Sequence, residues 1–180
     1  MSHHEKTTAL EQLREKIKDI RIAMLTTIDE DGSLRSRPMA TQESESDGEL
    51  WFFTAAGSAK AGEVERDHRV NLSYADPDDQ RYVSISGTAR MVRDRAKAEE
   101  LWNPILKAWF PKGLDDPELA LLRVQIEKAE YWDSPSSKMV QLVGFIKAVT
   151  TGKRYEPDPG ENEKIELTGA GARVTTPNRS

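Results

Sequence analysis

The stretch Tyr82-Val-Ser-Ile-Ser-Gly-Thr-Ala-Arg-Met-Val92 decides the fold of this 180-residue chain. Apolar or small residues occupy every second position, at Val83, Ile85, Gly87, Ala89 and Met91. Alternate side chains of a strand point to opposite faces, so these residues share one face, and Ser84, Ser86 and Thr88 share the other. The stretch therefore predicts the longest strand of a mostly antiparallel sheet.

The same period, or a composition rich in strand-forming residues, recurs on both sides of this stretch. Asp31-Gly32 is a hairpin turn signal between the first two predicted strands. In the third, Trp51 and Phe53 share one face while Phe52 lies on the other. The predicted strands cover residues 22–28, 33–39, 50–54, 70–74, 82–92 and 122–132.

Helices are predicted between and around these strands. The first opens with the capping-box spacing Thr8-Ala-Leu-Glu11. The third has Asp94 as its N-cap and should be kinked at Pro104. The predicted helices cover residues 8–20, 58–66, 94–109 and 136–151. Together the elements predict a mainly β fold with flanking helices (α+β), arranged as a small antiparallel barrel.

Composition limits the classes of protein that fit. The chain has 26 Lys plus Arg against 31 Asp plus Glu, a net charge of -5, which argues against a nucleic-acid binder that neutralises phosphates. No apolar run approaches the roughly 18 residues that span a bilayer, so we expect a cytoplasmic protein without a membrane partner. Residues 9–152 form the predicted domain, between a flexible start at 1–8 and a polar, mobile tail at 153–180.

Common catalytic and metal-binding signatures are missing from the sequence. Without Cys, thiolate chemistry and cysteine-ligated metals are excluded. His3 and His4 lie at the predicted frayed end and His68 stands alone, so no metal site is predicted. Gly57-Ser-Ala-Lys-Ala-Gly62 imitates the start of a phosphate loop, but Glu63 follows where that loop needs Lys. No Gly-x-Gly-x-x-Gly follows a strand, so a Rossmann-type dinucleotide site is not predicted.

One group of polar residues fits an anion beside a flat aromatic ligand. Arg35 and Arg37 lie two positions apart on a strand and therefore on one face. Thr54, Ser58 and Lys60 follow around a strand-to-helix turn, where hydroxyls, a mobile positive charge and helix N-terminal amides suit a phosphate. The alternative is that the basic side chains are solvated surface charges and Ser58 is only an N-cap.

Pro38 and three tryptophans leave a similar choice open. Pro38 cannot donate a ladder hydrogen bond, so it indicates an edge or bulge, which either offers main-chain groups to a ligand or only guards an edge strand. Trp102 and Trp109 fall on the apolar stripe of the third helix, which favours packing. Trp132, near a strand end, is a better candidate for an exposed wall of a ring-binding cleft.

A set of short motifs carries a resemblance to a known family. In chain order they are Arg35-Ser-Arg-Pro-Met39, Leu50-Trp-Phe-Phe-Thr54, Ser58-Ala-Lys60, Val70-Asn-Leu-Ser-Tyr74, Tyr82-Val-Ser-Ile-Ser-Gly87 and Glu130-Tyr-Trp-Asp133. From residue 10 to 152 the chain resembles a bacterial general stress protein of the pyridoxamine phosphate oxidase-like, FMN-binding split-barrel superfamily. The ordered set is considerably more specific than any single motif.

The resemblance implies a six-stranded antiparallel split barrel that forms a homodimer, with FMN at the subunit interface. Ser58 and Lys60 would hold the phosphate, while Arg37, Pro38 and Met39 would border the flavin ring. Some of the tryptophans would come from the second subunit. Together with the polar group above, the implied cofactor site comprises Arg35, Arg37, Pro38, Met39, Phe53, Thr54, Ser58, Lys60, Trp102, Trp109 and Trp132.

The resemblance favours flavin binding over any named reaction. True pyridoxamine phosphate oxidases end in a segment with Arg and Leu that grips the substrate, whereas this chain ends in Gly171-Ala-Arg-Val-Thr-Thr-Pro-Asn-Arg-Ser180, so vitamin B6 oxidation is not expected. We expect an FMN-dependent oxidoreductase that passes electrons from NADH or NADPH to flavin, oxygen or a small acceptor. The alternatives are a flavin-binding or sensing stress protein without turnover, and a split barrel that holds a deazaflavin or haem.

Overall fold

The computed structural model describes residues 3–42, 44, 48–133, 161–168 and 171–175. Its helices are α1 (His3–Ile17), α2 (Ala59–Arg66) and α3 (Arg95–Leu101), with 3-10 turns at Pro104–Ala108 and Gly113–Asp115. Its strands are β1 (Ile22–Ile28), β2 (Leu34–Ala40), β3 (Glu49–Ala55), β4 (Arg69–Asp76), β5 (Arg81–Val92), β6 (Leu119–Asp133), β7 (Glu161–Thr168) and β8 (Gly171–Thr175). The six predicted strands are all present.

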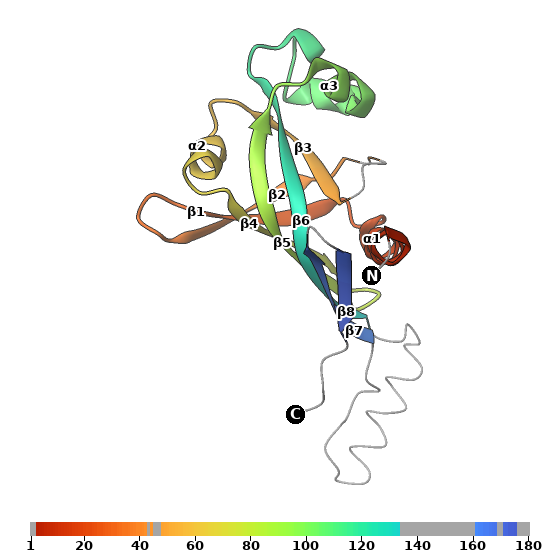
Figure 1. The fold of residues 1–180 in the computed structure, drawn as a ribbon. Helices are drawn as coiled ribbons and strands as arrows, with labels where there is room; N and C mark the ends of the chain where they lie inside the picture. The colour runs from red at the N-terminus through yellow and green to blue at the C-terminus, as the bar shows by residue number, and fades with distance from the viewer. Residues whose placement is uncertain (1–2, 43, 45–47, 134–160, 169–170, 176–180) are drawn as a thin grey trace, which may run out of the picture.

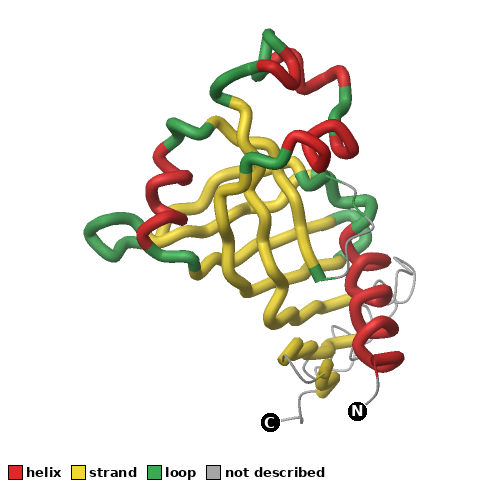
Figure 2. The backbone as a smooth tube through the Cα atoms, turned by 45° about the horizontal axis from the view of Figure 1, so that its top comes forward, coloured by secondary structure: helices red, strands yellow, loops and turns green. Residues whose placement is uncertain are grey.

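All eight strands belong to one antiparallel sheet in the order β2-β1-β4-β5-β6-β7-β8, with β3 also paired to β6 (Figure 1). The prediction that β5 is the longest strand is wrong, because β5 has 12 residues and β6 has 15. β6 begins three residues before the predicted strand and pairs with β5 over nearly its whole length. The other edge of β6 pairs with two strands, with β3 at residues 119–125 and with β7 at residues 128–133. Figure 2 shows α1 and α2 on opposite sides of the strands.

The barrel is split between β2 and β3. β2 pairs with β1 along its length and forms one end of the strand order. Among the described residues, a single bridge joins the region after β2 to β3, with the Gln42 amide donating to the Trp51 carbonyl at 2.9 Å. The sheet therefore curls without closing, as the split-barrel expectation requires, and the outer edge of β2 is left without a strand partner in this part of the structure.

A β-bulge sets the curvature between β5 and β6. The pairing shifts register between Ser86 and Gly87, where Glu127 is left out of the ladder. A Cβ on Gly87 would lie 2.1 Å from the carbonyl oxygen of Gln125, so only glycine lets the two backbones approach this closely.

Two apolar clusters lie on opposite faces of β3. Phe52 is fully buried in the main core, which is formed by the strand interiors together with α1 and Val64 of α2. Trp51, with Phe53 packed against it, belongs to a second cluster under α3. The predicted division of β3 into two faces is confirmed, and it places two aromatic residues outside the barrel interior.

The first helix begins earlier than predicted. α1 starts at His3, five residues before the capping box at Thr8, so Thr8 lies inside the helix. No Gly or Pro interrupts residues 3–8, which lets the helix continue upstream of the apolar stripe.

The third helix is shorter than predicted. Asp94 is its N-cap, accepting from the Lys97 amide at 3.0 Å, but the helix ends at Leu101 instead of continuing to Trp109. Asn103 before Pro104 is extended, as residues before proline usually are, and the chain continues as a 3-10 turn. Trp109, whose place on the predicted stripe favoured packing, is 70% exposed, and Ile105 is 69% exposed.

The segment predicted as a mobile tail contains two strands. β7 and β8 extend the sheet beyond β6, and Ile165 of β7 is fully buried beside Ala129. Charged residues alternate with Ile165 and Leu167 here, a period-two pattern that the polar composition of the segment conceals. The predicted helix over 136–151 lies outside the described residues. In the described part of the chain, no helix is both long enough and apolar enough to cross a bilayer.

Candidate functional site

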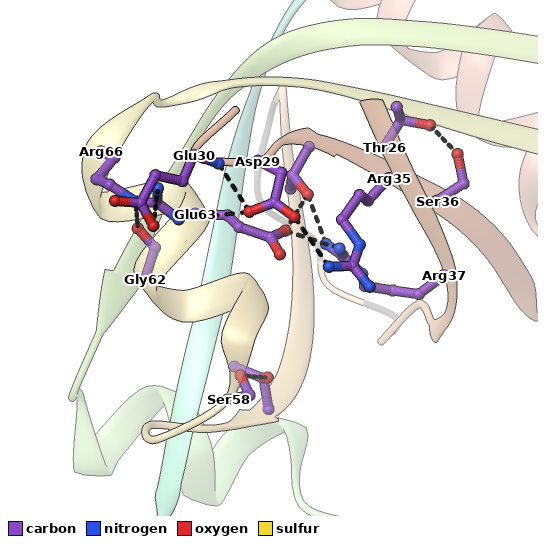
Figure 3. Close-up of polar contacts among 12 residues, drawn as sticks. Thr26, Asp29, Glu30, Arg35, Ser36, Arg37, Ser58, Gly62, Glu63 and Arg66 are labelled. Carbon is purple, nitrogen blue, oxygen red and sulfur yellow. Dashed lines mark hydrogen bonds and ion pairs between the residues drawn. The ribbon is translucent and has the colours of Figure 1, made fainter. Parts of the chain in front are cut away.

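The polar residues predicted to bind an anion lie around α2, between the β1–β2 hairpin and the end of β3 (Figure 3). Arg35 and Arg37 extend from β2 toward α2, while Ser36 points the other way to Thr26. The prediction that the two arginines share a face is therefore confirmed. Neither arginine is a free cation, because each is paired with a carboxylate.

Arg37, Thr27 and Glu63 form a closed triangle of hydrogen bonds. Arg37 donates to Glu63 Oε2 at 2.7 Å and to Thr27 Oγ1 at 2.5 Å. Thr27 in turn donates to the same Glu63 oxygen at 2.5 Å. Both Thr27 and Glu63 are almost completely buried, at 1% and 2% exposed, so the triangle fastens α2 to β1 and β2.

Glu63 is the residue that sequence reasoning missed. It stood out only as the wrong residue for a phosphate loop, and its partner Arg37 is 26 positions away. Burial by itself would raise the pKa of Glu63, but the hydrogen bonds from Thr27 and Arg37 and the charge of Arg37 outweigh it. The pKa of Glu63 is therefore lowered, and the buried group is a carboxylate at neutral pH.

Arg35 is held in the solvent-exposed part of the same surface. Its guanidinium donates to Asp29 at 2.9 Å, and this hydrogen bond, with the charge of Arg35, contributes to lowering the pKa of Asp29. Arg66, from the last turn of α2, lies 3.8 Å from Asp29 and 3.7 Å from Glu30. Arg35 and Arg66 therefore form exposed ion pairs, which agrees with the alternative interpretation of the basic side chains as surface charges.

Thr54, Ser58 and Lys60 meet where β3 passes into α2. Thr54 is buried and its hydroxyl lies 3.4 Å from that of Ser58, the N-cap of α2. The Ser58 side chain makes no cap hydrogen bond, so its hydroxyl can turn outward. Lys60 is half-buried in the first turn of α2, and no carboxylate lies within ion-pair distance of it among the described residues.

The environment of Lys60 disfavours its own charge. Burial is the largest cause and the charge of Arg37 the second, and both lower the pKa of Lys60, while Glu63 opposes them weakly. An anion placed here would reverse this balance. Hydroxyl donors, a helix N-terminus and an unpaired ammonium together fit a phosphate ester.

Pro38 and Met39 occupy the free edge of the barrel. Pro38 is exposed on β2, opposite Met24 of β1, and its position on an edge strand agrees with the prediction. The Met39 side chain is buried in the main core, so only its backbone is available to a ligand at this edge.

The aromatic candidates fall at two separate places. Phe53 packs edge-on against Trp102, with ring centres 5.8 Å apart, and also contacts Phe110. Trp109 belongs to the same end of the molecule, between β5 and the start of β6. Trp132 is 41% exposed near the opposite end of β6, paired with Tyr82 of β5. A single copy of the chain therefore does not bring Trp109 and Trp132 together.

The chain is similar to proteins from several organisms. Protein bli-3 of Neurospora crassa is 33% identical over 158 residues, covering 78% of this chain and 76% of that protein. A general stress FMN/FAD binding protein from Xanthomonas citri is 35% identical with a TM-score of 0.62, over 73% of this chain and 92% of that one. A general stress protein 26 from Jannaschia is 26% identical with a TM-score of 0.72, over 89% and 99%.

These relatives extend the similarity beyond the bacterial proteins that the motifs resembled, since Neurospora is a fungus. The two solved relatives share the split-barrel fold described above. The family model for pyridoxamine 5'-phosphate oxidase-like proteins matches residues 8–156, most of the chain. The chain therefore belongs to the pyridoxamine 5'-phosphate oxidase-like family.

Proposed function

We propose that this protein binds FMN, with the phosphate held where β3 passes into α2. The observation that carries the proposal is Lys60, a half-buried cation without a carboxylate partner in the described structure, beside the Thr54 and Ser58 hydroxyls. Such a group is costly unless a ligand compensates it. A phosphate ester carries up to two negative charges and accepts several hydrogen bonds, so it suits these donors.

The flavin ring would then lie along the outer edge of β2. Arg37, Pro38 and Met39 line this edge, and Phe53 and Thr54 belong to the strand on the other side of the split. Main-chain amides and carbonyls at an unpaired edge match the carbonyls and ring nitrogens of a flavin. Bound FMN supplies hydride and electron transfer, while these residues bind and orient it.

A second copy of the chain completes the proposed site. Nine neighbouring outward positions of β1, β4 and β5 carry no charged side chain, although 32% of the chain is charged and the same face carries Arg69 and Arg90 farther along β4 and β5; the nine are residues 22, 24, 26, 71, 73, 75, 82, 84 and 86. Ile22, Met24, Tyr82 and Trp132 are 41–50% exposed on or beside this face. A charge-free, partly apolar face suits a homodimer interface, and dimerisation would bring Trp132 of one copy toward the α3 end of the other.

We further propose an oxidoreductase that passes electrons from NADH or NADPH through FMN to flavin, oxygen or a small acceptor. The relatives described as flavin-binding stress proteins support the cofactor more directly than the reaction. Without a strong acid–base pair in the described site, the protein's part is to position the ring. Vitamin B6 oxidation is not part of the proposal, because the terminal segment lacks the expected gripping sequence.

The experiment that tests this function is cofactor titration of the purified protein. The protein is stripped of ligand, titrated with FMN, FAD and riboflavin, and passed over a gel-filtration column. We expect a yellow protein that prefers FMN and whose flavin is bleached by NADH or NADPH without oxygen. Retained flavin without bleaching would indicate a binding or sensing protein instead, and a colourless protein after excess FMN would refute the cofactor assignment.

A further inference from the structure

The charges around α2 are almost completely matched, and Glu63 does much of the matching. Arg35 pairs with Asp29 at 2.9 Å, and Arg37 pairs with Glu63 at 2.7 Å. Arg66 lies within 4 Å of two carboxylates, those of Asp29 and Glu30. Among the residues that the structure describes, Lys60 is therefore the cation of this surface that has no carboxylate within ion-pair distance.

Glu63 differs from the other carboxylates in being buried. Its side chain is 2% exposed, against 25% for Asp29 and 89% for Glu30. Water and salt screen the exposed carboxylates, whereas a buried charge acts through a medium of lower polarity and is felt farther away. Glu63 also influences Lys60 directly, because its charge raises the pKa of that lysine.

We propose that Glu63 is a specificity-determining residue that limits how strongly the site prefers a phosphate-bearing flavin to a neutral one. The proposal rests on the proposed flavin function. Glu63 cancels the charge of Arg37, so a bound phosphate meets one uncompensated cation instead of two.

A purely structural role for Glu63 makes a different prediction. If the triangle with Thr27 and Arg37 only fastens α2 to the sheet, its disruption loosens the whole site and weakens FMN and riboflavin together. The two flavins share the ring and differ in the phosphate, so the ratio of their dissociation constants isolates the phosphate interaction. That ratio is the readout on which the two roles disagree.

The test compares Glu63→Gln with the wild type by titration of both flavins at low and high salt. The glutamine keeps a carbonyl oxygen for Arg37 and Thr27 but removes the charge. We expect the preference for FMN over riboflavin to rise about tenfold at low salt and to shrink as salt increases. Glu65→Gln, an exposed position on the same helix, is the matched control and should leave the ratio unchanged.

A double variant keeps the proposal testable if Glu63→Gln folds poorly. Arg37→Gln alone leaves the Glu63 charge uncompensated and should lower the FMN preference, and adding Glu63→Gln should restore the wild-type ratio. A ratio unchanged or lowered in Glu63→Gln, or a double variant no better than Arg37→Gln, would overturn the proposal. If the wild type binds no flavin, the proposed function fails, and the binding of inorganic phosphate by the same variants still tests Glu63.

Discussion

At the scale of single residues, Lys60 shows how a ligand site can work against the stability of the free protein. Its pKa is lowered by burial first and by Arg37 second, so the unfolded chain binds a proton there more tightly than the folded one. Because the folded state disfavours the charged lysine, the charge on Lys60 lowers the free energy of unfolding at neutral pH. A phosphate would offset that cost when bound.

Lys60→Met should therefore stabilise the free protein and weaken FMN binding. The methionine keeps most of the side-chain volume and removes the charge. Loss of a charge-assisted contact of about 1.5–3 kcal/mol corresponds to roughly 10- to 150-fold weaker binding. Thermal unfolding of the ligand-free protein and calorimetric titration with FMN measure the two effects, and unaltered FMN affinity would remove Lys60 from the phosphate site. Lys60→Arg, which retains a charge, should bind FMN more tightly than Lys60→Met.

The preference for FMN over riboflavin should also depend on pH. It should rise toward neutrality as the phosphate reaches its second charge, at a pKa of about 6. It should then fall as the pH rises through the pKa of Lys60, which lies below 10.5 in the free protein. In Lys60→Arg the alkaline fall should disappear over this range, because arginine stays protonated. A wild-type preference that is constant from neutral to strongly alkaline pH would contradict this assignment.

Sequence reasoning could find Thr54, Ser58 and Lys60 because they are close along the chain. A strand followed by a short helix brings such residues together without any knowledge of the tertiary fold. Glu63 could not be found in this way, because a glutamate within a short helix usually faces solvent. Its burial depends on Arg37 and Thr27, which reach it from two strands of a distant hairpin.

At the scale of elements, the bulge between β5 and β6 depends on Gly87. A methyl group there would lie 2.1 Å from the Gln125 carbonyl oxygen, a backbone atom that cannot move without its strand. Gly87→Ala should therefore destabilise the protein by about 1–3 kcal/mol, as overpacking usually does. A urea midpoint equal to that of the wild type would mean that the strands separate here at no cost.

Gly62 is the matched control for this substitution. It lies within α2, and a Cβ there would meet no atom within 4 Å. Gly62→Ala should stabilise the protein by about 0.5–1 kcal/mol, because alanine loses less conformational freedom in a helix. The local backbone geometry therefore predicts that Gly87→Ala lowers the free energy of unfolding and Gly62→Ala raises it, although both replace glycine by alanine.

Elements with strong periodic patterns were predictable, and those that depend on partners were not. β5, with 12 residues, was predictable because its apolar or small residues alternate with polar ones. The five other predicted strands are also present. β7 was missed because charged residues occupy half of its positions, and β8 because it is short and begins with Gly171 and Ala172, which favour strands little. β7 is a strand because the edge of β6 from residue 128 offers backbone partners, and β8 pairs in turn with β7. The break after α3 follows from Pro104, but a sequence pattern alone favoured the longer apolar stripe.

At the scale of the whole molecule, the separation of the tryptophans makes the proposed dimer testable. β6 has 15 residues and spans about 50 Å at about 3.3 Å per residue, with Trp109 near one end and Trp132 near the other. No single flavin reaches both within one protomer. If both residues line one cofactor site, each site must take Trp109 from one copy and Trp132 from its partner.

This arrangement predicts complementation between two defective variants. Homodimers of Trp109→Ala and of Trp132→Ala should both bind FMN weakly, because every site in them lacks one wall. In a mixed dimer, one site lacks both tryptophans and the other is intact, so half of the sites should regain wild-type affinity. Differently tagged chains, co-expressed and purified through both tags, provide the mixed dimer for titration. If both walls came from the same copy, each site of the mixed dimer would lack one tryptophan, and no tight site would appear.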